Sequence, residues 1–381
     1  MRIGVDIRTL SEGKTSGVEV YTTKLLQSLF ALDKENSYIL FSNSFKKKIS
    51  LSKGFSFDNV VLKAFNYPNR ILNVLLRYLN FPKLDRLVGG VDLFFSPRFL
   101  FSAFSKNCRL LVTAHDISFH HAPHLFSRRQ RIWHWIIDDK KVFKRANAIL
   151  AVSDHTKKDL VNFFGIQESK IFKVSPGVDH DQYSPVKKDS DQSFFSRHRL
   201  KEGYLLYLGT LEPRKNVESI IAAYEIFRSS KAGGPQLVIA GNRGWLYEKS
   251  IEMIHKSKYV RDIVELHSLS EDDKPALYRG AKLFLFPSFY EGFGFPPLEA
   301  EACGVPCVVS HNSSFPEVLG DSAVYVNPFR VSQIARAIDE LYNDSEFYEQ
   351  KRTQGITNAR RFSWNKSAEE VLAVIQSLKK I

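Results

Sequence analysis

The segment 282–310 reads KLFLFPSFYEGFGFPPLEAEACGVPCVVS and contains, in order, a predicted strand, a loop, a short helix and a second strand. LFLFPS is a continuous apolar run, as expected for a buried strand. PPLEAEAC is predicted to be helical because proline is favoured at the first helical position, where its missing N–H has no partner. Gly304 and Pro306 then end the helix. Such a strand–helix–strand unit indicates a parallel sheet.

The same alternation extends along the chain of 381 residues, which is long enough for two domains. Apolar runs predict thirteen strands in two sets, with amphipathic segments between many of them. We therefore expect an α/β protein with two facing Rossmann-like, doubly wound domains and a C-terminal helix that returns to the first domain. The polar, aperiodic segment 179–202 is the predicted linker. The expected domains are residues 1–180 and 181–363, followed by the helix at 364–381.

Positive charge is concentrated in the first half of the chain. Residues 1–185 contain 28 Lys and Arg against 16 Asp and Glu, a net charge of +12. Residues 186–381 contain 26 against 25, a net charge of +1. This asymmetry favours an anionic partner, such as a membrane surface or a phosphorylated acceptor, although it is also compatible with an ordinary basic surface.

The sequence has no apolar stretch of about 20 residues, the length needed to span a membrane. The apolar run in MRIGVDI is short and is followed at once by Arg8, so we do not expect it to be a secretory signal. Its three cysteines cannot form a disulfide framework, which favours a reducing compartment. Cys303 and Cys307 are expected to be packed thiols. We therefore expect a cytoplasmic protein.

Two glutamates flank the Gly-Phe-Gly sequence of the opening segment. Glu291 lies in the predicted loop and Glu299 in the first turn of the predicted helix. Each has a simple alternative explanation, because Glu291 can be an exposed loop acid and Glu299 can complement the helix dipole. Glycines that allow close backbone approach favour a binding site instead. The spacing suits two contacts with one long ligand better than a hydrolase pair, whose two carboxyl groups flank a single bond.

Three further loops contain candidate site residues. Arg214 and Lys215 follow a predicted strand and Gly209, next to a helix start, which is a favourable place for an anion such as phosphate. His115 follows the strand RLLVTA, together with Asp116. Gly17 precedes the first predicted helix. Because ligands of doubly wound sheets bind at the carboxyl ends of the strands, these loops are expected to carry the site.

Taken together, these loops resemble glycosyltransferase family 4, the retaining glycosyltransferases of the GT-B fold. The resemblance spans nearly the whole chain and rests on the Glu-x7-Glu pair within FPSFYEGFGFPPLEAEACGVPCVVS and on GTLEPRKN, HD, VSDHTKKDL and PGVD. GTLEPRKN is most similar to mannosyltransferases that build surface polysaccharides. The chain departs from the family at Thr210, where relatives often have arginine, so the phosphate charge would rest on two cations.

The resemblance implies a role for each matching residue. Glu299 would hold the ribose hydroxyls of a sugar nucleotide, and Glu291 would contact the transferred sugar. Arg214 and Lys215 would neutralise the leaving diphosphate, and His115 would lie near the reacting face. The implied donor-binding residues are Glu299, Phe293, Gly294, Phe295, Gly209, Thr210, Leu269 and Gly17.

The family further implies a hexosyltransferase that retains configuration, needs no metal and has no cofactor. Its donor would be a sugar nucleotide, with GDP-mannose as the first candidate. Its acceptor would be a glycan or a polyprenyl-diphosphate-linked sugar in polysaccharide or lipopolysaccharide synthesis. Segment 124–145 mixes cations with Trp133 and Trp135, and segment 71–81 is a second apolar candidate. Each segment alone is explained at least as well by ordinary amphipathic packing, but together with the charge asymmetry they form the hypothesis of peripheral contact with the inner face of the cell membrane.

Other functions agree with parts of the sequence. A sugar-nucleotide epimerase or phosphorylase would have the same fold but would act without a glycosyl acceptor. A nucleic-acid-binding protein would use the basic half of the chain, but the sequence contains no recognised binding module. Gly13-Lys14-Thr15 lacks the first glycine of a phosphate-binding loop, since that position is Arg8. A metal site among His115, His120, His121 and His124 is disfavoured because Pro123 breaks any helical spacing.

Overall fold

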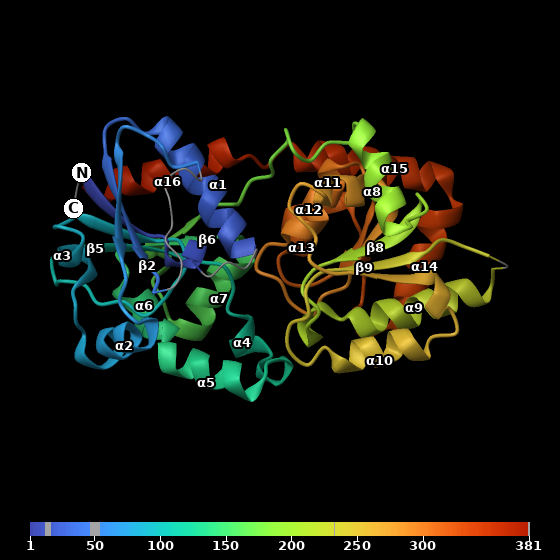
Figure 1. Ribbon diagram of the computed structural model, residues 1–381, viewed down its shortest axis with the longest axis horizontal. Helices are drawn as coiled ribbons and strands as arrows, with labels where there is room; N and C mark the ends of the chain where they lie inside the picture. Colours follow the sequence, from blue (N-terminus) through green and yellow to red (C-terminus); the bar gives the residue numbers. More distant parts are fainter. Residues whose placement is uncertain (12–16, 46–53, 232, 380–381) are drawn as a thin grey trace. The chain divides into compact units, whose positions relative to one another are not determined.

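The computed structural model describes residues 1–11, 17–45, 54–231 and 233–379. The rejected phosphate-loop candidate at 13–15 lies outside the described residues. The chain divides into two compact units (Figure 1). Unit 1 comprises residues 1–121, 128–177 and 363–381, and unit 2 comprises residues 122–127 and 178–362.

Unit 1 is built on a parallel sheet of seven strands in the order β3-β2-β1-β4-β5-β6-β7. The strands form where the apolar runs predict them. They are β1 (Arg2–Asp6), β2 (Ser37–Asn43), β3 (Val60–Phe65), β4 (Leu93–Ser96), β5 (Arg109–Ala114), β6 (Ala148–Ala151) and β7 (Ile171–Lys173).

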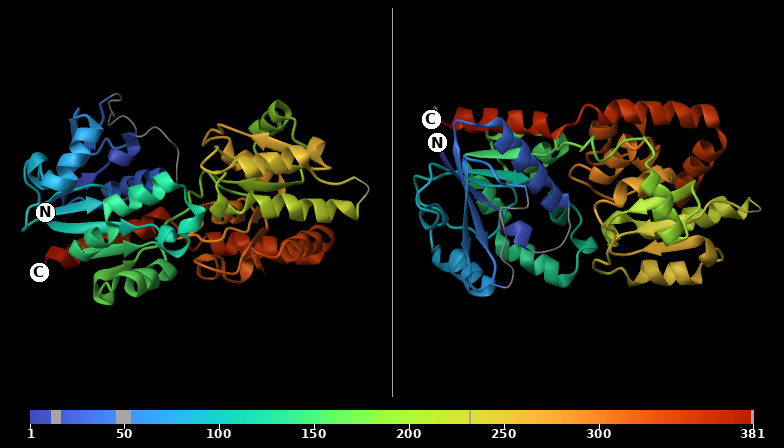
Figure 2. Two further views of the ribbon diagram at one scale, coloured as in Figure 1. Left: turned by 90° about the horizontal axis from the view of Figure 1, so that it is seen from below. Right: turned by 45° about the horizontal axis from the view of Figure 1, so that its top comes forward.

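Helices cover both faces of this sheet (Figures 1 and 2). The C-terminal helix α16 packs along α1, and its Trp364 is buried against Tyr21. The helices of unit 1 are α1 (Gly17–Leu32), α2 (Asn69–Val74) with the π-helical turn η2 (Leu75–Leu79), α3 (Leu84–Leu87), α4 (Ser118–His121), α5 (Arg128–Ile137), α6 (Asp139–Arg145), α7 (Asp154–Phe164) and α16 (Trp364–Lys379).

Unit 2 contains a second parallel sheet, in the order β10-β9-β8-β11-β12-β13. In Figure 1, α9, α10 and α14 lie on one side of it, and α8, α11, α12 and α15 lie on the other. The strands are β8 (Tyr204–Leu208), β9 (Leu237–Ala240), β10 (Ile263–Leu266), β11 (Ala281–Phe286), β12 (Cys307–Ser310) and β13 (Val324–Val326). The helices are α8 (Asp189–His198), α9 (Val217–Ser229), α10 (Glu248–Lys256), α11 (Lys274–Arg279), α12 (Phe295–Ala302), α13 (Phe315–Leu319), α14 (Val331–Asn343) and α15 (Ser345–Ala359).

The predicted linker at 179–202 is wrong in its second half. Residues 189–198 form α8, which belongs to unit 2 and packs against α11. Phe194 and Phe195 are buried, and Asp191 makes a 2.6 Å ion pair with Arg279. The helix is short and carries its two large apolar residues side by side, so the segment lacks the repeating pattern by which helices are predicted.

Each sheet reverses its strand order once. In unit 1 the reversal lies between β1 and β4, and in unit 2 it lies between β8 and β11. Two loops diverge from such a point at the carboxyl ends of the strands, which is where doubly wound sheets bind ligands. In unit 2 these two loops contain Arg214 and Glu291.

Candidate active site

The loops after β8 and β11 are joined by direct hydrogen bonds. The backbone N–H of Phe289 donates to the carbonyl of Arg214 over 2.9 Å. The buried Asn216 side chain donates to the carbonyls of Pro287 and Pro328, at 3.0 and 2.8 Å. These bonds fix the two loops relative to each other, so side chains distant in sequence meet in a defined geometry.

Glu291 is held by both predicted phosphate-binding cations. Lys215 Nζ lies 2.7 Å from Glu291 Oε1, and an Arg214 guanidinium nitrogen lies 3.0 Å from Glu291 Oε2. Arg214 also pairs with Glu212 at 2.8 Å and donates to the Tyr290 carbonyl. The structure therefore brings Glu291, Arg214 and Lys215 together, as expected, and adds Glu212 to the cluster.

Burial and charge act differently on the two carboxylates of this cluster. Burial would raise the pKa of Glu291, but Arg214 and Lys215 outweigh it and hold the pKa below its usual range. Glu291 is thus a charged hydrogen-bond acceptor at neutral pH. For Glu212, burial outweighs the attraction of Arg214 and Lys215 and raises the pKa.

The Gly-Phe-Gly loop is fixed by two serines that follow β12. Ser314 Oγ donates to the carbonyls of Glu291 and Phe293, both at 3.0 Å, and the Glu291 N–H donates to Ser313 Oγ. Gly294 has a φ of +99°, and a Cβ there would lie 2.7 Å from the Phe315 ring. Glycine is therefore required at this position both by the backbone conformation and by the available space.

Glu299 lies one residue further into α12 than predicted. The helix begins at Phe295, with prolines as its second and third residues, so Glu299 is in the second turn and not the first. The reason is that Gly294, with its positive φ, serves as the N-cap and sets the helix start. The dipole explanation for this glutamate is correspondingly weaker, because the dipole effect fades beyond the first turn.

Two tyrosines lie beside the buried Glu299. Tyr278 donates its hydroxyl to Glu299 Oε2 over 2.8 Å, and the ring of Tyr183 packs edge to face on that of Tyr278. Burial raises the pKa of Glu299, an effect that the charge of Lys274 and the bond from Tyr278 oppose. The carboxylate is thus oriented by the Tyr278 hydroxyl and keeps lone pairs for further donors.

The other predicted donor-binding residues of unit 2 lie around the same edge of the sheet. Gly209 follows β8, and a Cβ there would approach the Tyr207 hydroxyl to 2.9 Å. Thr210 is exposed, and its carbonyl accepts from that hydroxyl. Leu269 is half-buried in the loop after β10. Phe293 is buried, whereas Phe295 is half-buried and packs edge to face against it.

His115 and Gly17 belong to unit 1. His115 follows β5, its Nε2 lies 2.8 Å from the Pro97 carbonyl, and its ring packs edge to face on Tyr21. Burial lowers the pKa of His115 to about 4, so the ring is neutral at pH 7. With Nε2–H donating to Pro97, Nδ1 is left as an acceptor. Gly17 is exposed and is the first residue of α1.

Sequence reasoning missed Glu212, Tyr278, Tyr183 and the two serines after β12. Glu212 lies within GTLEPRKN, so its place beside Arg214 could have been noticed. The tyrosines and serines come from segments without any motif, and only the fold brings them to the glutamates. Cys303 and Cys307 are buried free thiols, which confirms that prediction.

Comparison with known proteins agrees with this geometry. Residues 188–362 match the family model "Glycosyl transferases group 1", and residues 15–182 match "Glycosyltransferase Family 4". O-antigen chain mannosyltransferase B of Escherichia coli is 31% identical over 265 residues, which is 69% of each chain. Serotype-specific mannosyltransferase WbdA of the same species is also 31% identical, but the match covers 59% of this chain and only 28% of that longer protein.

The fold is also found in solved structures. Sucrose-phosphate synthase from Thermosynechococcus elongatus superimposes with a TM-score of 0.80 at 16% identity, covering 100% of this chain and 99% of that one. The architecture is therefore that of the GT-B glycosyltransferases. The chain belongs to glycosyltransferase family 4. Among the described residues, no helix is both long and apolar enough to cross a membrane.

Proposed function

We propose that this protein is a retaining hexosyltransferase that transfers mannose from GDP-mannose to a glycan or lipid-linked acceptor in surface polysaccharide synthesis. The cluster of Glu291, Arg214 and Lys215 at the reversal point of the second sheet is the observation that carries this proposal. The printed names of the O-antigen mannosyltransferases support mannose as the transferred sugar.

Arg214 and Lys215 would bind the diphosphate of the donor. As the sugar leaves, negative charge develops on the distal phosphate, and cations already fixed by Glu291 and Glu212 would stabilise it without reorganisation. This pair would supply the charge compensation that the reaction needs, so we propose a metal-independent transfer.

Glu299 would accept hydrogen bonds from the ribose hydroxyls, since one carboxylate can accept two such bonds. Glu291 would accept from a hydroxyl of the transferred sugar, for which its low pKa keeps it charged. In unit 1, Nδ1 of the neutral His115 is suited to accept from another sugar hydroxyl. A site whose polar groups hydrogen-bond to the hydroxyls of a sugar discriminates strongly against ligands that lack those hydroxyls.

Retention of configuration is supported by the state of Glu291. Its carboxylate is engaged by two cations, which makes it a poor nucleophile towards the anomeric carbon. We therefore propose front-face transfer through an oxocarbenium-like state, in which the leaving phosphate takes the proton of the acceptor hydroxyl. The anomeric configuration of the product, measured by NMR, tests this step, and an inverted product would contradict it.

A panel of sugar nucleotides tests the donor. A ligand that binds only the folded protein raises its melting temperature. We expect GDP-mannose to raise it more than UDP-glucose does, and we expect turnover only when an acceptor is added. An absence of any shift with every sugar nucleotide would contradict the donor assignment. Conversion of the donor without an acceptor would instead indicate an epimerase or phosphorylase.

For the acceptor we propose a lipid-linked sugar at the cytoplasmic face of the membrane, reached through a surface of unit 1. A pocket of about 170 Å³ is lined by residues of both α2 and α5, so these helices share one surface. Large apolar and basic side chains of α2, of α5 and of the segment 75–81 are exposed. The apolar residues are Ile71, Val74, Tyr78, Leu79, Phe81, Ile132 and Trp135, and the exposed cations are Arg70, Arg128, Arg129 and Arg131.

Vesicle sedimentation tests this contact. We expect binding to vesicles with anionic lipid and weak binding to neutral ones, with the difference reduced at high salt. Trp135→Ser, which removes an 81% exposed indole, should weaken binding. Phe329→Ser removes a 76% exposed ring from unit 2 and should not. Equal effects of the two substitutions would contradict the assignment of the surface.

A further inference from the structure

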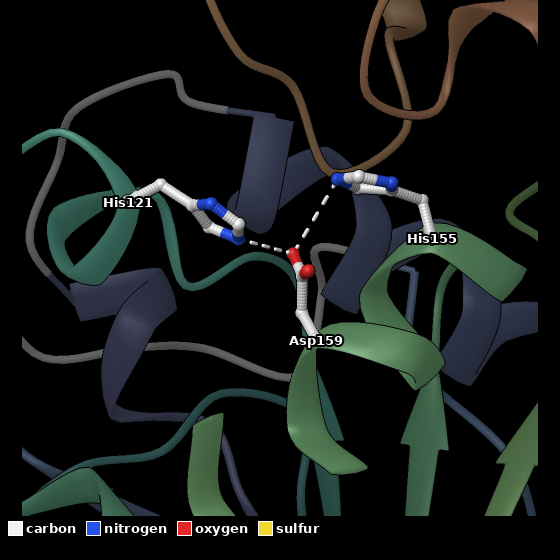
Figure 3. A group of neighbouring side chains, drawn as sticks. All are labelled: His121, His155 and Asp159. Carbon is white, nitrogen blue, oxygen red and sulfur yellow. Dashed lines mark ion pairs between the residues drawn. The ribbon is translucent and has the colours of Figure 1, made fainter. Parts of the chain in front are cut away.

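Three side chains of unit 1 converge on one point outside the candidate active site (Figure 3). They are His121 at the end of α4, and His155 and Asp159 on α7. Their ligand atoms all lie within 4.8 Å of one another. Neither the donor chemistry nor the acceptor surface proposed above uses any of the three.

We propose that His121, His155 and Asp159 form a binding site for one Zn²⁺ ion. His155 and Asp159 are four residues apart on a helix, so their side chains lie on the same face. His121 comes from a different element, which means that the ion would tie the end of α4 to α7. His155 and Asp159 lie more than 30 residues beyond His121 in the sequence, so no local spacing among His115, His120, His121 and His124 predicts this site.

The distances suit a small tetrahedral ion. His121 Nε2 and His155 Nε2 lie 2.9 and 3.4 Å from the same oxygen, Asp159 Oδ2. With Zn–N and Zn–O bonds of about 2.0–2.2 Å, neighbouring ligand atoms of a tetrahedron are about 3.3 Å apart. The two pairs with Asp159 therefore need adjustments of only a few tenths of an ångström. The two histidine nitrogens, which lie within 4.8 Å of each other, would move together around the ion.

Neighbouring residues hold the three ligand side chains in place, and the site remains accessible to an ion from solvent. Asp159 is buried, and the His121 ring packs edge to face on Phe163 of the same helix with centroids 4.4 Å apart. Both histidine side chains are 29% exposed, which gives an ion access from solvent and leaves room for water as a fourth ligand.

The donor set selects the class of metal. Two imidazole nitrogens and one carboxylate oxygen suit Zn²⁺, whereas Mg²⁺ and Ca²⁺ prefer shells made wholly of oxygen. The ion would link two elements of unit 1 and would take no part in glycosyl transfer. A failure of the zinc proposal would therefore not affect the proposed function, and a failure of the proposed function would not affect the zinc proposal.

Calorimetric titration tests the site. Full-length protein without a histidine tag is treated with chelator, desalted and titrated with ZnCl₂, and in parallel with MgCl₂. We expect one Zn²⁺ per chain at this site, a rise in melting temperature with Zn²⁺, and no binding of Mg²⁺. Absence of Zn²⁺ binding, or equally tight binding of Mg²⁺, would overturn the proposal.

Matched variants locate the ion. His121→Asn and His155→Asn should each weaken Zn²⁺ binding at least about tenfold, since even outer-shell changes cost that much. His255→Asn alters an exposed histidine of α10 and should bind as the wild type does. Because His121 is partly exposed, its variant is expected to fold even if that of His155 does not. Wild-type affinity in His121→Asn would refute the site.

Discussion

Lys215 Nζ lies 2.7 Å from Glu291 Oε1, although the two residues are 76 positions apart in the sequence. The same carboxylate accepts a second contact from Arg214, so two cations and one anion form a single unit at the end of the second sheet. Because these groups are largely buried, the charge of each depends on the others. Removing the anion and removing a cation of this unit should therefore change product binding in opposite directions, while both slow turnover.

Glu291→Gln should bind GDP more tightly than the wild type while turning over more slowly. Loss of the carboxylate removes a negative charge beside the two cations, which should raise GDP affinity about threefold or more. Turnover should fall at least about 100-fold, because the sugar loses its charged acceptor. Calorimetry with GDP and steady-state kinetics measure the two effects.

Lys215→Ala is the contrasting variant. It removes a cation and should weaken GDP binding as well as turnover. If Glu291→Gln weakened GDP binding as much as Lys215→Ala does, the proposed division of roles would be wrong.

Tyr278→Phe should raise the KM for the donor about tenfold with little change in kcat. The hydroxyl orients Glu299, and a hydrogen bond to a charged group contributes about 1.5–3 kcal/mol. Tyr224→Phe is the control, because its buried hydroxyl donates to the Pro235 carbonyl, away from the glutamates. Both variants should melt at a lower temperature, but only Tyr278→Phe should change KM.

His115 should make the protein less stable in mild acid. Its folded pKa of about 4 lies below the ordinary value of 6.5, so the unfolded chain binds the proton first as the pH falls. Stability is thus lost between pH 6.5 and 4, by about 2 kcal/mol at pH 5 from this residue. His115→Gln should lose less stability than the wild type between pH 7 and pH 5 in chemical unfolding. An unchanged loss would show that the ring is not buried in its neutral form.

Glu301 should have the opposite pH dependence. Burial raises its pKa to about 8, although Ser322 and Asn358 hydrogen-bond to it. The folded protein therefore holds the proton more tightly, and stability falls as the pH rises from 4.5 to 8. Glu301→Gln should remove this loss and stabilise the protein by up to about 3 kcal/mol at pH 7. It should leave donor binding intact, whereas Glu299→Gln should not, and matching binding defects would contradict the separate roles.

Much of the fold could be predicted from the sequence, because the strands that the structure describes coincide with short apolar runs of the sequence. The loops that contain Arg214, Lys215 and Glu291 could also be expected to carry one site, because loops after parallel strands share one edge of a sheet. Helix α8 was not predicted because its apolar residues do not recur at the three- or four-residue spacing of an amphipathic helix. The predicted start of α12 differs from the observed one because Gly294, with its positive φ, is the N-cap. Residue types alone do not predict that backbone conformation.

Two sets of contacts could not be predicted, and the reason is different. They are the tyrosines beside Glu299, and His155 and Asp159 of α7 beside His121. Each group combines residues from separate elements, and contacts of this kind depend on how helices pack on the sheet. No local pattern marks Tyr183 or Asp159 as more than a core or surface residue. Such contacts become visible only in the three-dimensional structure.

A crystal structure with a non-transferable analogue of GDP-mannose tests the central claim most directly. We expect diphosphate oxygens within about 3 Å of Arg214 and Lys215, and the ribose hydroxyls on Glu299. In that complex, Glu291 should contact the sugar. A well-ordered analogue bound away from the loops at 209–216 and 291–299 would contradict the account.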